Sequence, residues 1–441
     1  MEPLNLYFFT YNCGLSLIDI DHFSSHFFDA LPVTDNSSSF TPDLIVLSLQ
    51  EIAPIPYAFL GGSYLTPYFA SFSQAIDLAT AQLYGSQYVN VVKDNSGMTG
   101  LMVFARSEVV GHLSPPSIAR VGFGFQETGN KGAVGARLSY SIQKSPESGV
   151  DLTFIAAHLA PMEDAVARRN ADWRSMVEGL VFDSKSSDSE NVENGDESEG
   201  AALLPSSGSD NRYRGIFAPG SYLFIGGDLN YRTADRLPSK ADYLRFPQAD
   251  ADSDSSLHYS QLLKEDQLKR EMRQFRCFHG LSEAPIDFPP TYKYHSEAQA
   301  AARDPANANE APQWKWTSHR WPSWCDRVLF LNTPPGLGKE SEVNILKYDA
   351  LPVSPTSDHR PVALTVSIPI SKRRAIVDHE TAAPFPINSE WASRRDVAQR
   401  KEYLIGCLAY LGMTWEGNGL LLASTIGVLG AWFVLRSLFT S

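Results

Sequence analysis

The 441-residue sequence contains only four cysteines, at positions 13, 277, 325 and 407, and they lie far apart in the chain. This spacing excludes a CxxC metal site and a dense disulfide framework, and it fits a reducing compartment. The first ten residues carry neither a basic segment nor a long apolar run, so no secretory signal is predicted there. Basic residues are in the minority, because 37 Lys and Arg stand against 50 Asp and Glu, and the formal net charge is −13. A protein that coats nucleic acid needs a basic surface, so we expect no nucleic-acid partner.

Several motifs of hydrolytic and nucleotide-binding enzymes are also missing. The sequence has no HExxH segment and no Cys/His cluster, so a zinc site is not expected. It has no GxSxG elbow, no GxxxxGK[ST] loop and no CxxxxxR phosphate cradle. Covalent serine chemistry, nucleoside-triphosphate hydrolysis and cysteine-phosphatase chemistry therefore have no support, and direct attack by an activated water remains.

Strand-like apolar runs alternate with turns and helical segments from residue 4 to about residue 368. We predict strands at Leu4–Thr10, Asp43–Leu49, Leu101–Ala105, Val134–Ser139, Leu152–Ala157, Ser221–Ile225, Val328–Leu331 and Val362–Ser367. Helices are predicted at Ser73–Leu83, at Met162–Leu180 and near Tyr259–Phe275. This interleaving indicates a single α/β domain over residues 1–369. Residues 183–214 are rich in Ser, Asp, Glu and Gly, so we predict a disordered acidic insertion there, with an ordinary solvated loop as the alternative.

The C-terminal part of the chain predicts a membrane anchor over residues 403–441, joined to the domain by a linker at 370–402. The span Gly419–Leu435 contains no charged residue. As a helix it would be roughly 25 Å long, close to the thickness of an endoplasmic-reticulum bilayer. A buried core helix is the alternative at this length. Basic residues at 394, 395, 400 and 401 fit a cytosolic flank. We therefore expect a tail-anchored protein of the endoplasmic-reticulum membrane with its domain in the cytosol, or of another intracellular membrane.

Polar side chains recur where the predicted strands end or begin. Each by itself is commonly a helix cap or a structural residue. Together they supply the carboxylate, amide and imidazole groups of a hydrolytic site, and loops beside a rigid sheet are a usual place for such a site. Asp and Glu oxygens supported by Asn suit Mg²⁺, which prefers oxygen ligands. The residues are Asn12, Glu51, His158, Asp228, Asn230, Asp358 and His359.

Five blocks of sequence, in this order, resemble those of the inositol-polyphosphate 5-phosphatases. They are Gly129–Arg137, Gly227–Arg232, Phe288–Tyr294, Trp321–Arg327 and Ser357–Val362. The resemblance extends from about residue 4 to 368 and is closest to small, tail-anchored fungal phosphatidylinositol 4,5-bisphosphate 5-phosphatases. It implies the four-layer, deoxyribonuclease-I-like α/β fold of the exonuclease–endonuclease–phosphatase superfamily, in which two packed mixed β-sheets are flanked by helices. In one departure, Ser318 stands where family members often carry a lysine.

The resemblance also implies roles for individual residues. Glu51 matches the principal Mg²⁺ ligand, with Asn12 close to the metal and Asp358 in its outer shell. Asp228 matches the carboxylate that positions and deprotonates the attacking water, and Asn230 matches an amide that binds the scissile phosphate. The remaining catalytic positions are His158 and His359, which hold phosphate oxygens, and Asp326, which orients His359. Substrate-binding positions are Lys131, Arg232, Tyr292, Lys293 and Arg327.

The predicted activity is removal of the 5-phosphate of phosphatidylinositol 4,5-bisphosphate, giving phosphatidylinositol 4-phosphate and inorganic phosphate. The 3,5-bisphosphate and the trisphosphate remain alternative substrates. A nuclease of the same superfamily is a rival enzyme, and a membrane tether that has kept the domain for binding is a rival of another class. Nothing in the sequence indicates an oligomer, so a monomer is expected.

Overall fold

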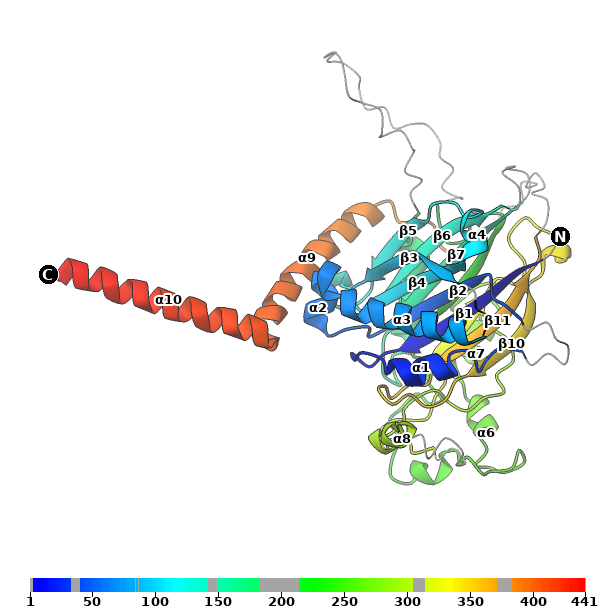
Figure 1. Ribbon diagram of the computed structural model, residues 1–441. Coiled ribbons are helices and arrows are strands. Elements are labelled where there is room, and N and C mark those ends of the chain that lie inside the picture. Colours follow the sequence, from blue (N-terminus) through cyan, green and yellow to red (C-terminus); the bar gives the residue numbers. More distant parts are fainter. Residues whose placement is uncertain are drawn as a thin grey trace, which may run out of the picture.

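The computed structural model describes residues 3–32, 40–83, 85, 87–141, 149–182, 214–303, 314–370 and 383–440. Two β-sheets pack face to face at its centre (Figure 1). The first sheet has the order β10 (Asn344–Ala350), β11 (Val362–Ile368), β1 (Leu4–Asn12), β2 (Leu44–Gln50), β4 (Thr99–Arg106) and β3 (Tyr88–Ser96). The second has the order β5 (Ser117–Gly122), β6 (Gly132–Tyr140), β7 (Val150–His158), β8 (Ser221–Asp228) and β9 (Asp326–Phe330). β1 and β2 are parallel, as are β7 and β8, and the other paired strands are antiparallel, so both sheets are mixed.

The alternation of side chains along β1 shows how the layers are held together. Phe8 faces the second sheet, with its ring centroid 6.3 Å from those of Phe154 and Phe224. Its neighbours Tyr7 and Phe9 point to the opposite face and pack with other buried residues beneath helices. Gly226 has no Cβ, and a Cβ there would lie 2.3 Å from the Phe8 ring, so glycine is required for this close packing. The core between the sheets is therefore aromatic and tightly packed.

Helices cover the outer faces of both sheets. α1 (Ile20–His26) and α3 (Thr66–Leu83) pack on the first sheet, and α5 (Val166–Gly179) and α7 (Gln267–Arg273) pack on the second. The shorter helices are α2 (Ile55–Leu60), α4 (Ser107–Val110), α6 (Tyr259–Leu263) and α8 (Ser296–Ala302), with 3-10 turns η1 (Gly62–Tyr64), η2 (Phe125–Glu127), η4 (Asp242–Arg245) and η6 (Lys339–Ser341). The predicted fold of two mixed sheets with flanking helices is thus confirmed.

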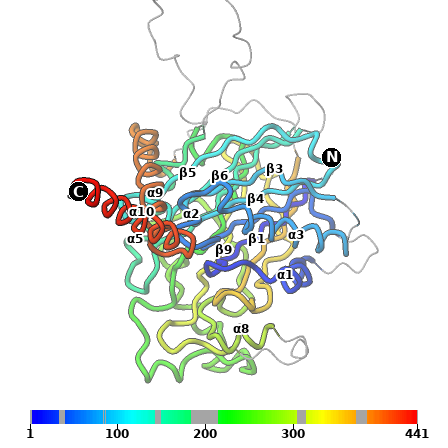
Figure 2. The backbone as a smooth tube through the Cα atoms, turned by 60° about the vertical axis from the view of Figure 1, so that its left-hand side comes forward, coloured from blue at the N-terminus to red at the C-terminus, as the bar shows by residue number. Residues whose placement is uncertain are grey.

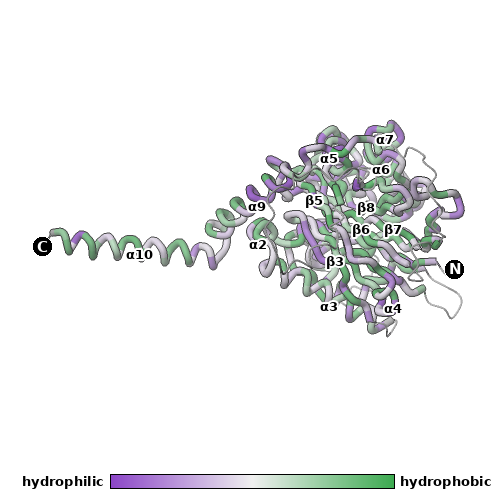
Figure 3. The backbone as a smooth tube through the Cα atoms, turned by 90° about the horizontal axis from the view of Figure 1, so that it is seen from above, coloured by the Kyte–Doolittle hydropathy of each residue, from purple (hydrophilic) through white to green (hydrophobic). Residues whose placement is uncertain are grey.

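The C-terminal segment forms two long helices. α9 (Trp391–Met413) lies against the domain beside α2, and α10 (Trp415–Thr440) projects away from it (Figures 1 and 2). Among the described residues, Trp415–Phe439 is the one helix long and apolar enough to cross a membrane, and none of its most apolar window is buried (Figure 3). α9 runs across the predicted boundary between linker and anchor at residue 403. The predicted acidic insertion lies outside the described residues, apart from Arg214.

Candidate active site

Strand ends from both sheets meet at one end of the sandwich. Asn12 ends β1 and lies opposite Gln50 of β2, which is followed by Glu51. In the second sheet, the ends of the parallel strands β7 and β8 place His158 directly opposite Asp228. The chain enters β11 at this end too, because β11 is antiparallel to β1. Sequence segments that are far apart are therefore brought to one site by strand register.

Asp228 is the central carboxylate of this group and is 2% exposed. Its Oδ2 accepts a hydrogen bond from Asn12 Nδ2 at 3.0 Å and lies 3.2 Å from His158 Nε2 and 4.0 Å from His359 Nε2. Its Oδ1 accepts from the backbone N–H of Asn230 at 3.1 Å. Burial alone would raise the pKa of Asp228, but the hydrogen bond to His158 and the charges of His359 and Lys131 outweigh it and hold the pKa well below the usual range. Asp228 is therefore ionised at neutral pH.

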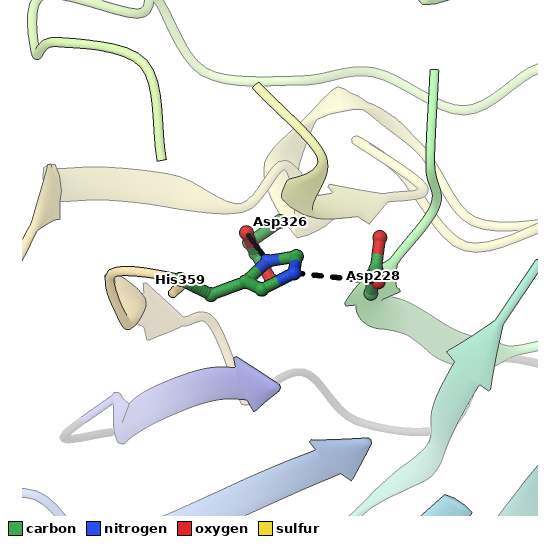
Figure 4. A group of neighbouring side chains, drawn as sticks. All are labelled: Asp228, Asp326 and His359. Carbon is green, nitrogen blue, oxygen red and sulfur yellow. Dashed lines mark hydrogen bonds and ion pairs between the residues drawn. The ribbon is translucent and has the colours of Figure 1, made fainter. Parts of the chain in front are cut away.

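His359 and Asp326 form a buried pair next to Asp228 (Figure 4). His359 Nδ1 lies 2.8 Å from Asp326 Oδ2, which also accepts from the Thr291 hydroxyl at 2.7 Å. Burial disfavours the charged imidazole, but the Asp326 carboxylate outweighs this effect and raises the pKa of His359 to about 9. The pair therefore presents the Nε2 of a positively charged imidazole towards Asp228.

Lys131 and His158 form a second polar contact near Asp228. Lys131 Nζ is 2.5 Å from His158 Nε2 and 3.5 Å from Glu51 Oε1. Burial, reinforced by the Lys131 charge, lowers the pKa of His158, so this imidazole is neutral where His359 is charged. Burial also lowers the pKa of Lys131, although the carboxylates of Glu51 and Asp228 oppose the shift. The two histidines are thus in opposite charge states, and the Nε2 atoms of both lie within 4.0 Å of the same Asp228 oxygen.

Two of the site residues have left-handed backbone conformations. The φ angle is 49° at Glu51 and 57° at Asn230. Residues with a Cβ rarely adopt this region, and each such residue costs on the order of 1–3 kcal/mol unless its surroundings stabilise it. At Asn230 the surroundings stabilise this conformation through a hydrogen bond, which the Asn230 side chain donates to the Leu159 carbonyl at 3.2 Å. Both residues come just after the end of a strand: Glu51 follows β2, and Asn230 follows β8.

The donor set fits a hard divalent cation. Glu51, Asn12 and Asp228 offer carboxylate and amide oxygens, and the Glu51 side chain is 28% exposed, so its oxygens are accessible. The atoms of Asp228, Asp326 and His359 also lie within 4.8 Å of one another. In that second group, however, Asp326 Oδ2 already accepts two hydrogen bonds. Asp358 accepts from Lys293 Nζ, and its Oδ1 is 3.9 Å from His359 Nε2. The oxygens of Asp228 and Asn12 also accept hydrogen bonds, from Asn12 Nδ2 and the backbone N–H groups of Asn230 and Gly14, so the Glu51 carboxylate is the most accessible candidate ligand of these three residues.

Tyr292, Lys293 and Arg232 lie beside these residues. The Tyr292 ring centroid is 4.6 Å from that of His359, and the Arg232 guanidinium carbon is 4.3 Å from the Tyr292 ring. Arg232 is 2% exposed and donates to the backbone oxygen of Asn230 at 3.1 Å and to its side-chain oxygen. An open cleft of about 540 Å³ lies alongside, lined by Lys293 and Asp358 among others. Two cations, Lys293 and Arg303, are among the residues that line this cleft.

Arg327, which was predicted to bind substrate, lies apart from this group in the structure. Its side chain is fully buried, and its nitrogens pair with Asp266 at 3.0 Å and Glu283 at 2.5 Å. The reason lies in β9, where successive side chains point to opposite faces of the sheet. Asp326 faces the site, so Arg327 faces away from it. Arg327 is a structural cation.

Two residues of the site were not predicted. Thr291 donates to Asp326, and the Ser357 hydroxyl donates to the Asn12 carbonyl at 2.6 Å while accepting from the His359 N–H at 3.1 Å. Both stand inside the sequence blocks quoted above, so the available signal was their position next to predicted residues. The structure thus brings Asn12, Glu51, Lys131, His158, Asp228, Asn230, Arg232, Tyr292, Lys293, Asp326, Asp358 and His359 to one end of the sandwich.

Comparisons with known proteins agree with this geometry. Residues 9–365 match the model of Endonuclease/Exonuclease/phosphatase family 2. The chain is 30% identical over 301 residues to type II inositol polyphosphate 5-phosphatase 15 of Arabidopsis thaliana, covering 65% of this chain and 25% of that protein. It is 26% identical over 328 residues to polyphosphatidylinositol phosphatase INP53 of Saccharomyces cerevisiae, covering 73% and 23%. The chain therefore spans about a quarter of the length of these relatives.

Solved structures show the same fold. The inositol polyphosphate 5-phosphatase domain of synaptojanin, in complex with inositol (1,4)-bisphosphate and a calcium ion, matches with a TM-score of 0.57 at 20% identity and covers 91% of this chain and 90% of that one. Cimex nitrophorin in a ferrous NO complex matches with a TM-score of 0.50 at 18% identity, covering 83% and 99%. Since such different proteins share the fold, the fold by itself does not assign an activity. The family match and the curated relatives decide the assignment: the chain belongs to the endonuclease/exonuclease/phosphatase family and is a homologue of the inositol polyphosphate 5-phosphatases.

Proposed function

We propose that the chain is a Mg²⁺-dependent phosphoinositide 5-phosphatase that converts phosphatidylinositol 4,5-bisphosphate to phosphatidylinositol 4-phosphate and inorganic phosphate. The observation that carries the proposal is the ionised Asp228 carboxylate, whose Oδ2 lies near both a neutral and a charged imidazole. This arrangement suits direct attack of water on a phosphate, because a carboxylate that can orient the water lies beside a cation for the phosphate oxygens. The relatives named above are phosphatases of inositol phosphates and phosphoinositides, which supports the substrate class.

In this proposal the residues around Asp228 divide the work. Asp228 orients the water and accepts its hydrogen bond, and Asn12 and the Asn230 N–H hold the carboxylate in place. His359, charged through its contact with Asp326, stabilises the negative charge that develops on the phosphate oxygens. The neutral His158, whose Nε2 contacts Lys131 and Asp228, is proposed to help hold the phosphate oxygens. No covalent enzyme intermediate is required.

Glu51 would be the principal ligand of the divalent cation, with Asn12 close to it and Asp358 in its outer shell. When bound, Mg²⁺ would polarise the scissile phosphate and neutralise part of its charge. The synaptojanin domain was crystallised with calcium, which supports a divalent site in the fold. Magnesium is proposed because the candidate donors are oxygen atoms.

Substrate binding is proposed for Lys131, Lys293 and Tyr292. Lys293 lines the cleft, the Tyr292 ring packs on His359 and Lys131 contacts His158, which supports this assignment. Arg232 is proposed to act through Asn230, to which its guanidinium is bonded. α10 is proposed to span a membrane, with the endoplasmic reticulum as its address and the domain on the cytosolic side. Its length and apolar composition support a span.

The experiment is phosphate release by the purified full-length chain from a panel of phosphoinositides in mixed micelles, with and without Mg²⁺. We expect release from phosphatidylinositol 4,5-bisphosphate, with the 4-phosphate isomer identified as product by chromatography against standards. DNA serves as a control substrate and should remain intact. Formation of the 5-phosphate isomer, or release from no phosphoinositide, would refute the proposal.

A further inference from the structure

One face of α9 lies on the domain next to the candidate active site. Residues four apart share a face of a helix, and Arg394, Ala398, Glu402, Gly406 and Tyr410 follow this spacing. Ala398 and Gly406 are buried within this row. The row therefore marks the side of α9 that packs against the domain, from near its first turn to near its last.

The C-terminal half of this face, with Gly406 and Tyr410, packs on α2. A Cβ at Gly406 would lie 3.0 Å from Cβ of Phe59, so the helix backbone approaches α2 closely. The Tyr410 ring lies 6.4 Å from Tyr57 and 5.4 Å from Tyr64, measured between ring centroids. α2 begins shortly after Glu51 at the end of β2. This contact therefore holds α9 at the same end of the sandwich as the site.

The N-terminal half of the face, from Arg394 to Glu402, contacts the turn that precedes β6. Arg394 donates to both carboxylate oxygens of Glu127, a contact at the surface. Glu402 makes the more specific contact, because its Oε1 accepts a hydrogen bond from the backbone N–H of Gly129 at 2.6 Å. Burial raises the pKa of Glu402 above its ordinary value, and the Gly129 bond opposes the shift. A half-buried carboxylate is costly unless it is bonded, so this bond fixes the position of the side chain.

Gly129 is two residues from Lys131, whose ammonium reaches His158. The Gly129 carbonyl accepts from Met98 N–H at 2.9 Å, and a Cβ at Gly129 would lie 2.7 Å from the nitrogen of Gly97. The peptide groups around Gly129 are thus held on one side by the β3–β4 turn and on the other by Glu402. If either contact is removed, the segment that positions Lys131 is held on one side only.

We infer that Glu402 is a positioning residue for the active site: it holds Gly129–Lys131 from outside the domain, through a helix that leads directly into α10. α9 ends at Met413 and α10 begins at Trp415, so the segment that orients Lys131 is continuous with the proposed membrane span. This inference rests on the proposed function, since it assigns a role in that reaction to a residue outside the catalytic set.

The test uses the full-length chain in detergent micelles with dioctanoyl phosphatidylinositol 4,5-bisphosphate as substrate. Glu402→Ala removes the acceptor, and we expect kcat/KM to fall about tenfold, as for loss of one hydrogen bond that involves a charged group. Glu402→Gln keeps an oxygen acceptor and should recover most of the activity. Asp396→Asn is the matched control, because it removes an acidic charge from the same helix at a residue that contacts the neighbouring Arg395 rather than the Gly129 turn.

Hydrogen–deuterium exchange supplies a readout that does not depend on activity. In Glu402→Ala, the peptide containing Gly129 should exchange faster, while peptides of β7 and β8 should not change. Unaltered exchange, or unaltered kcat/KM in a variant whose exchange has increased, would overturn the inference. If the wild type released no phosphate from any phosphoinositide, the proposed function would fail, and exchange at Gly129 would still show whether Glu402 holds this turn.

Discussion

Replacing Arg327 with leucine distinguishes a structural cation from a substrate-binding one. Arg327 is fully buried, and its guanidinium pairs with two carboxylates, Asp266 at 3.0 Å and Glu283 at 2.5 Å. The Asp266 side chain is also fully buried, and that of Glu283 is 6% exposed. Leucine would leave both carboxylates without their cation, in a place where water cannot replace it.

Removing one partner of a buried ion pair costs about 3–5 kcal/mol, because the charge that remains is unpaired. Since two carboxylates lose their partner here, we expect the upper end of this range. The other bonds of these carboxylates do not substitute for it: Asp266 caps α7 through the Lys269 N–H, and Glu283 accepts from the Tyr348 hydroxyl at 3.1 Å. Neither the backbone N–H of Lys269 nor the Tyr348 hydroxyl is a positively charged group.

Urea unfolding of the wild type and of Arg327→Leu measures the loss directly. Adding Asp266→Asn and Glu283→Gln to Arg327→Leu removes the stranded charges and should restore most of the lost free energy of unfolding. The KM of folded Arg327→Leu should equal that of the wild type, because the side chain faces away from the site. A stable Arg327→Leu protein with a raised KM would refute the reasoning and return Arg327 to the substrate site.

Three further predictions concern the site and the anchor. In Asp326→Asn, the pKa of His359 should fall from about 9, because the carboxylate that raises it is removed. His359 then loses its proton at a lower pH, and the alkaline limb of the kcat/KM profile should shift to lower pH. An alkaline limb at the same pH in the variant would mean that the charge of His359 is not needed for the reaction. Glu51→Gln should raise the Mg²⁺ concentration needed for half-maximal activity, and an unchanged titration would place the metal elsewhere. Leu429→Arg, at roughly 2.5–3.5 kcal/mol of insertion cost, should move the protein out of carbonate-washed membranes, and continued pelleting would mean that α10 is not the anchor.

The strands that could be predicted from the sequence differ in position from those that could not. The eight predicted strands each overlap an observed one, and most of these are interior strands with continuous buried runs. The three that were not predicted, β3, β5 and β10, are all sheet edges. Their side chains are partly exposed, as in Tyr88–Ser96, where a buried residue recurs every four positions rather than every two and polar residues interrupt the apolar pattern. Edge strands commonly carry polar residues, so periodicity is weak there.

The sequence predicts which residues form the site better than it predicts how these residues are arranged. Short blocks identified Asp228, Asp326 and His359, but proximity in sequence also suggested Arg327, which strand alternation turns away. The contact of Glu402 with Gly129 had no sequence signal, because the face of α9 that packs on the domain contains small and charged residues rather than an apolar stripe. Residues 391–402 were expected in a linker for the same reason. Tertiary contacts, rather than local pattern, decide both cases.

The most direct test of the central claim compares phosphate release by the wild type and by Asp228→Asn, from phosphatidylinositol 4,5-bisphosphate in the presence of Mg²⁺. The substitution keeps the size of the side chain and removes the charge that accepts a proton from water, and loss of such a group typically lowers the rate by about 10²–10⁴-fold. The account predicts that the wild type releases the 5-phosphate and that Asp228→Asn, with the same circular dichroism spectrum, releases almost none. Turnover by Asp228→Asn within a few-fold of the wild type would contradict it.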